Sequence, residues 1–103
     1  MNSRLDSLLK LLEKEPEDSF LIYGVALEYM SANKLEEAEN YFTKLIKLDP
    51  GYVASYMQYA ALKEKQNKID EAKELYKQGI EIARKAGDNH AAKEMEGFLD
   101  ELK

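Results

Sequence analysis

The sequence predicts an all-α protein built from antiparallel helix hairpins. The 103-residue chain aligns with itself at a shift of 34 residues, and self-similarity near this period is a signature of helical repeats. In each copy the apolar residues recur at helical spacing, as expected of helices that bury one face. A short polar break divides each copy into two helices. The two copies account for four helices, and with one further helix on each side of them we expect about six helices and no sheet.

The residues that match at this shift carry the repeat. Identical residues face one another in these pairs: Pro16 with Pro50, Ala26 with Ala60, Asn33-Lys34 with Asn67-Lys68, Glu37-Ala38 with Glu71-Ala72, and Ile46 with Ile80. Other pairs are mostly like-for-like replacements: Ile22 with Tyr56, Val25 with Tyr59, Leu35 with Ile69, and Phe42 with Tyr76. The chain therefore holds two copies of one helical unit.

Breaks between the helices are marked by residues that end or begin helices. Asparagine at Asn33 and Asn67 tolerates the left-handed backbone that commonly ends a helix. Acidic pairs follow at Glu36-Glu37 and Asp70-Glu71, and they suit the positive end of the next helix. Asp49-Pro50-Gly51 separates the units, because proline disfavours helical geometry in the preceding residue.

The segments that flank the two units fit the same scheme. A shift of 34 puts Leu8 under Phe42, so the first helix matches the second half of a unit. The last helix is amphipathic but carries Lys93 and Glu94 where the second unit has apolar residues, as expected of a polar capping helix. We expect helices near residues 3–14, 18–32, 35–48, 52–66, 69–86 and 89–102.

Three positions near the last helix predict local detail. Gly87 is expected to end the fifth helix, and Asp88 to begin the sixth by accepting from its free amides. Gly79 lies inside a predicted helix, where glycine costs about 1 kcal/mol relative to alanine. We therefore expect a close neighbour at Gly79, namely Ala91 or Ala92 of the last helix.

Over about residues 17–84 the chain resembles the tetratricopeptide repeat family. The positions that carry the resemblance are the small residues Ala26 and Ala60, the helix-crossing alanines Ala38 and Ala72, the following aromatics Phe42 and Tyr76, and the closing proline Pro50. The sequence departs from the family at its early tryptophan, which is replaced by Ile22 and Tyr56, and at Arg84, where a closing proline is absent. We expect the helix that contains Arg84 to run on.

The resemblance implies a short right-handed α-solenoid in a single domain spanning residues 1–103. Its expected parts are an N-terminal half-repeat helix at 1–16, repeats at 17–50 and 51–84, and a C-terminal capping helix at 87–103. Small alanines at the helix crossings let the paired helices approach closely, with Phe42 and Tyr76 filling the space beside them.

No motif in the sequence predicts catalysis, and we expect no enzyme, cofactor or metal site. The chain has no cysteine, and His90 has no second imidazole near it, whereas a zinc site needs three or four ligands. Its many carboxylates show neither a calcium-loop pattern nor a facing acid-base pair. No phosphate-binding glycine loop or nucleophile elbow occurs.

Charge and hydropathy indicate which environments the chain does not suit. A net charge of −5 disfavours nucleic-acid binding, which depends on clustered lysine and arginine. Arg84, Lys85 and Lys77 are better explained as cations near a helix C-terminus. Residues 1–15 lack the uninterrupted apolar core of a signal peptide, and no run is long enough to span a membrane. We expect a cytoplasmic protein.

The resemblance implies that the first helix of each pair lines a mostly apolar concave groove that binds a peptide or helix of a partner protein. The partner-binding residues expected there are Phe20, Tyr23, Leu27, Met30, Met57, Gln58 and Ala61. Ala91, Ala92 and Met95 would extend the groove if the last helix continues the stack. Members of this family that bind acidic chaperone tails use lysine and asparagine on this face. The residues here include Tyr23, Leu27 and Gln58, which do not reproduce that clamp. An alternative interpretation is that these residues belong to the buried core.

A structural homodimer, which self-associates through the apolar N-terminal helix or through the groove, is the second hypothesis. Five leucines cover more than one face of the first predicted helix: Leu5, Leu8, Leu9, Leu11 and Leu12. A helix that is apolar on several sides needs several neighbours. The substitution Leu9→Lys is expected to disrupt such a dimer.

Overall fold

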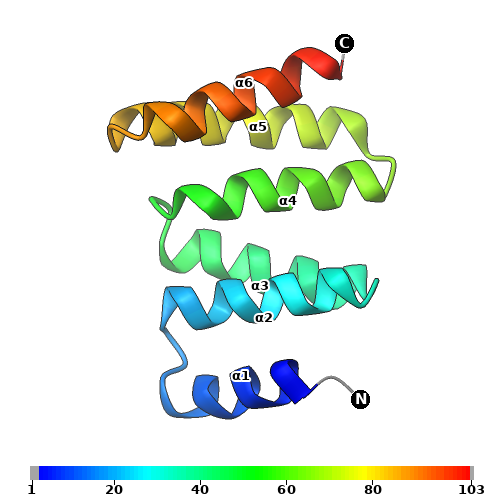
Figure 1. Cartoon of the computed structure of the whole chain (residues 1–103), viewed down its shortest axis with the longest axis vertical. Helices are drawn as coiled ribbons and strands as arrows, with labels where there is room; N and C mark the ends of the chain where they lie inside the picture. The colour runs from blue at the N-terminus through cyan, green and yellow to red at the C-terminus, as the bar shows by residue number, and fades with distance from the viewer. Residues whose placement is uncertain (1–2, 103) are drawn as a thin grey trace. The chain divides into compact units, whose positions relative to one another are not determined.

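The computed structural model describes residues 3–102, and all its regular structure is helical (Figure 1). Its helices are α1 (Ser3–Lys14), α2 (Ser19–Ser31), α3 (Leu35–Leu48), α4 (Val53–Lys65), α5 (Ile69–Lys85) and α6 (Asn89–Glu101). The expected bounds agree with these to within one residue. The prediction of an all-α fold of helical hairpins is confirmed.

The chain forms two compact units, and the boundary lies between Pro50 and Gly51. Unit 1 holds α1, α2 and α3, and unit 2 holds α4, α5 and α6. In unit 1 the hairpin α2–α3 is joined by α1, which packs on α2. In unit 2 the hairpin α4–α5 is joined by α6, which packs mainly on α5. The boundary coincides with the end of the first sequence repeat.

Helices α2 and α4 end in the same hydrogen-bonded motif. Asn33 and Asn67 have φ angles of 62° and 60°, as expected for left-handed residues after a helix. The amide of Lys34 donates to the carbonyl of Tyr29, and that of Asn33 to the carbonyl of Met30. This pair of bonds satisfies carbonyls that the helix leaves free.

The end of α5 and the beginning of α6 confirm the expected roles of Gly87 and Asp88. Gly87 has a φ of 77°, and the Asp88 amide donates to the carbonyl of Ala83 at 2.8 Å. The Asp88 side chain then accepts from the amide of Ala91 at 3.0 Å. Asp18 caps α2 in the same way by accepting from the amide of Leu21.

Small residues let the helices of unit 1 pack closely. Ala26 and Ala38 are fully buried, and so is Phe42 beside them. Where α1 meets α2, a β-carbon at Gly24 would lie 3.3 Å from Leu8 Cδ1. Glycine at this position therefore admits the leucine side chain of α1.

In unit 2, the prediction of which residues lie next to Gly79 is wrong. Gly79 is indeed closely packed, but its neighbours are Met95 of α6 and Tyr56 of α4, and not Ala91 or Ala92. Both alanines are buried, but neither supplies the atoms nearest to the Gly79 β-carbon position. Met95 lies one turn further along α6, and its long flexible side chain reaches the gap that the glycine leaves.

Candidate partner-binding surface

The described residues include no cluster of side chains of the kind that holds a metal ion. Within residues 3–102, no group of three or more histidine or acidic side chains could hold a metal ion. His90 is exposed, and its Nε2 lies 3.5 Å from Glu94 Oε1. None of the helices in this part of the chain is long and apolar enough to cross a bilayer.

The basic side chains that the sequence groups near the end of α5 are paired with carboxylates. Arg84 pairs with Glu96 of α6. Lys85 Nζ lies 3.5 Å from Glu81 Oε1 within the same helix. These ion pairs neutralise the basic side chains within unit 2, so the side chains do not form a continuous basic surface.

In unit 1, four of the predicted binding residues share one face of α2. Phe20, Tyr23, Leu27 and Met30 follow one another at spacings of three and four, which place side chains on one side of a helix. Phe20 is 68% exposed, and the other three are half-buried. We call these four residues the α2 face.

In unit 2, the other predicted residues lie on α4. Met57, Gln58 and Ala61 are all half-buried. Met57 and Ala61 share a helix face with Glu64, while Gln58 lies beside that face. We call Met57, Ala61 and Glu64 the α4 face. It is less apolar than the α2 face, because it ends in a carboxylate.

The prediction that Ala91, Ala92 and Met95 extend the surface is wrong, because all three are buried. They pack in the interior of unit 2 and are unavailable to a partner. Phe98 is instead the apolar side chain that α6 exposes, at 38%. The signal that finds it is the 34-residue shift, which aligns Phe98 with Glu64 of the α4 face.

Tyr76 joins Glu64 to Phe98 in unit 2. Its hydroxyl donates to Glu64 Oε2 at 2.5 Å, and its ring centroid lies 5.8 Å from that of Phe98. Burial, followed by the hydrogen bond to Glu64 and the negative charges of Glu64 and Glu101, raises the pKa of the Tyr76 hydroxyl above its ordinary value. The hydroxyl is therefore a neutral donor that holds the carboxylate of Glu64.

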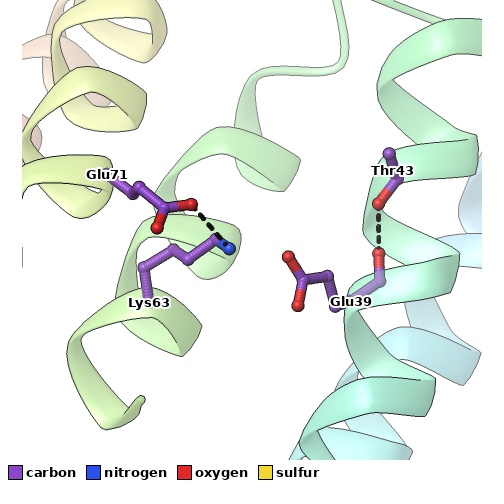
Figure 2. Close-up of polar contacts among 4 residues, drawn as sticks. All are labelled: Glu39, Thr43, Lys63 and Glu71. Carbon is purple, nitrogen blue, oxygen red and sulfur yellow. Dashed lines mark hydrogen bonds and ion pairs between the residues drawn. The ribbon is translucent and has the colours of Figure 1, made fainter. Parts of the chain in front are cut away.

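A buried lysine lies on another side of α4. Lys63 is only 4% exposed, and its Nζ lies 3.0 Å from Glu71 Oε1 (Figure 2). The same ammonium group stands 5.4 Å from the ring centroid of Tyr59. These contacts compensate the burial of a charge, which is costly when it has no partner. Lys63 is therefore held inside unit 2 and is not a clamp for an acidic peptide.

A hollow that the sequence did not predict opens on unit 1. Its volume is about 1020 Å³, and it lies between the loop after α1 and the exposed side of α3. Acidic residues of the loop, such as Glu17, and lysines of α3, such as Lys47, line it together. In Figure 2, Thr43 of this lining donates its hydroxyl to the carbonyl of Glu39. None of the predicted binding residues lines the hollow.

Comparisons with known proteins agree with this geometry. The chain is 28% identical over 98 residues to the TPR repeat-containing protein PA0015 of Pseudomonas aeruginosa, covering 95% of this chain and 93% of that protein. The solution structure of a tetratricopeptide repeat domain protein from Salinibacter ruber is 32% identical, with a TM-score of 0.82 over 85% of this chain and 89% of that one. The TPR2B domain of yeast Sti1, solved with pHsp70, has a TM-score of 0.89 at 17% identity over 95% of this chain and 78% of that one. A family model described as tetratricopeptide repeat matches residues 29–95, more than half of the sequence, and the chain therefore belongs to the tetratricopeptide repeat family.

Proposed function

We propose that this chain binds a helix or an extended segment of a partner protein through the α2 face of unit 1, and that the α4 face of unit 2 is a separate contact surface of the same kind. Domains of its family are typically protein–protein interaction modules. The observation that carries the proposal is Phe20, a large apolar side chain that is 68% exposed at the start of the α2 face. Leu27 and Met30 continue an apolar stripe from it, which suits the apolar anchors of an amphipathic segment.

Two proteins of similar fold have been solved with a bound partner. The TPR2B domain of yeast Sti1 is bound to pHsp70, and PcrH is bound to the chaperone-binding region of PopD. The residues of this chain do not favour binding of an acidic tail. Tyr23 and Leu27 on α2 and Met57 on α4 offer apolar contact, and Lys63 of α4 is buried and paired with Glu71.

Phe20→Asp tests the proposal in the full chain. Because Phe20 is exposed, the variant should unfold at nearly the same urea concentration as the parent. It should nevertheless recover far fewer peptides from a random 12-residue displayed library. Leu48→Asp is the matched control, since Leu48 is an exposed apolar residue of α3 that lies outside both faces. Equal peptide recovery by the parent and Phe20→Asp would count against the proposal.

The double variant Tyr23→Asp and Met57→Asp distinguishes binding surface from core. Both side chains are half-buried, so each could serve either role. A folded variant with lost peptide recovery supports the binding role. Loss of the helical circular dichroism signal supports the core role and leaves Phe20 as the test of the surface.

A homodimer through α1 is the second candidate function. Leu11 of α1 is 49% exposed, whereas Leu45, which lies one repeat later, is fully buried. Sedimentation across protein concentration tests it, with Leu11→Lys as the disrupting variant. Leu11 is a better target than Leu9, which is half-buried. A monomer at every concentration would exclude this dimer.

A further inference from the structure

The two units differ at one end of their predicted binding faces. Glu64 lies one 34-residue repeat after Met30, and Tyr76 lies one repeat after Phe42. Unit 1 thus has an apolar pair at these positions, whereas unit 2 has a carboxylate and a phenol joined by a 2.5 Å hydrogen bond. The change places an acidic group on an otherwise apolar helix face.

An exposed aromatic ring lies next to this carboxylate. Phe98 of α6 is 38% exposed and contacts the buried ring of Tyr76. Met57 and Ala61 supply half-buried apolar surface on the same face of α4 as Glu64. We call Met57, Ala61, Glu64 and Phe98 the acidic-aromatic surface of unit 2.

The charge of Glu64 is available to a partner. Within residues 3–102, Glu64 forms no ion pair. The neighbouring Lys63 is directed to Glu71. Glu101 adds a second negative charge close enough to act on Tyr76. A carboxylate has about four acceptor sites, and Tyr76 uses one of them.

We propose that the acidic-aromatic surface of unit 2 receives a partner segment in which an apolar side chain lies next to a lysine or an arginine. This inference rests on the proposed function and adds the chemistry of the partner. The apolar side chain covers Met57, Ala61 and Phe98, and the cation pairs with Glu64. Tyr76 holds the carboxylate in place, so less conformational freedom is lost when the cation binds.

Selection from a random 12-residue peptide library displayed on phage tests this pairing with the full chain. Peptides recovered by the parent chain should be enriched in lysine or arginine beside an aromatic or aliphatic residue. Glu64→Gln removes the charge but keeps an oxygen that can accept from Tyr76. A recovered peptide should bind this variant about 3- to 10-fold more weakly, as expected from the loss of one charge pair.

Glu36→Gln is the matched control, because it removes an exposed carboxylate from α3 and changes the net charge equally. It should bind the same peptide as tightly as the parent chain does. Equal affinity for the parent and Glu64→Gln, or equal weakening by both variants, would overturn the inference and leave the proposed function intact. Failure of the parent chain to enrich any peptide would overturn both.

Discussion

Gly79 of α5 lies against Met95 of α6, and a β-carbon at the glycine would stand 2.5 Å from the Met95 sulfur. The same β-carbon would lie 2.8 Å from Tyr56 Cβ. Met95 and Tyr56 come from different helices, so Gly79 is the point at which α4, α5 and α6 approach one another. The helices of unit 2 can pack this closely because Gly79 has no side chain.

Replacing this glycine should therefore destabilise the protein. Gly79→Ala gains helix propensity, but the new methyl group overlaps Tyr56 Cβ, which the backbone holds in place. We expect a net loss of about 1–2 kcal/mol in the free energy of unfolding, because overpacking outweighs the propensity gain. Urea denaturation followed by circular dichroism measures it.

Gly97→Ala is the matched control for that substitution. Gly97 also lies inside a helix, but nothing stands within 4 Å of its β-carbon position. Alanine should therefore stabilise α6 by up to about 1 kcal/mol. If both alanine variants were stabilised, the close approach at Gly79 would be refuted.

Sequence periodicity predicts the helices well because local rules decide them. The helix ends at Asn33, Asn67 and Gly87 depend on residues that tolerate a positive φ, and those residues are visible in the sequence. The close neighbour of Gly79, by contrast, is decided by tertiary packing. The sequence indicates that something must approach the glycine, but only the packing of α6 shows that Met95 does so.

Ala72→Arg should prevent unit 2 from folding. Ala72 is fully buried on α5, which packs on α4, so arginine would overpack the interior and bury an unpaired charge. The helical circular dichroism signal of the chain should fall at 25 °C, because the helices of unit 2 are lost. Gln78→Arg places the same side chain at an exposed position of α5 and should unfold like the parent. Equal melting of the two variants would contradict this burial of Ala72.

Asn67 tests the termination of α4. Its φ of 60° is strained for most residues with a β-carbon, whereas glycine adopts it freely. Asn67→Ala should lower the free energy of unfolding by about 1 kcal/mol, and Asn67→Gly should leave it nearly unchanged. Comparison of their urea midpoints provides the measurement, and a more stable alanine variant would be inconsistent with the left-handed end.

The candidate surface is less predictable than the fold because exposure depends on tertiary packing. The helical period correctly groups Phe20 with Leu27 on one face of α2. It cannot show that Met95 turns inward while Phe98, three residues later, remains exposed. That division is decided by where α5 lies against α6.

Tyr76→Phe should reveal the raised pKa of the hydroxyl as a pH-dependent difference in stability. At pH 7 the variant loses the hydrogen bond to Glu64 and should be less stable by about 1–2 kcal/mol. Below the ordinary tyrosine pKa of 10.0, both folded and unfolded chains keep the proton, so the difference is constant. Above it the unfolded chain releases the proton while the folded chain retains it, which destabilises only the parent. The two unfolding free energies, measured in urea from pH 7 to pH 11, should therefore converge above pH 10. A gap that stays constant over that range would show that the phenol titrates alike in both states.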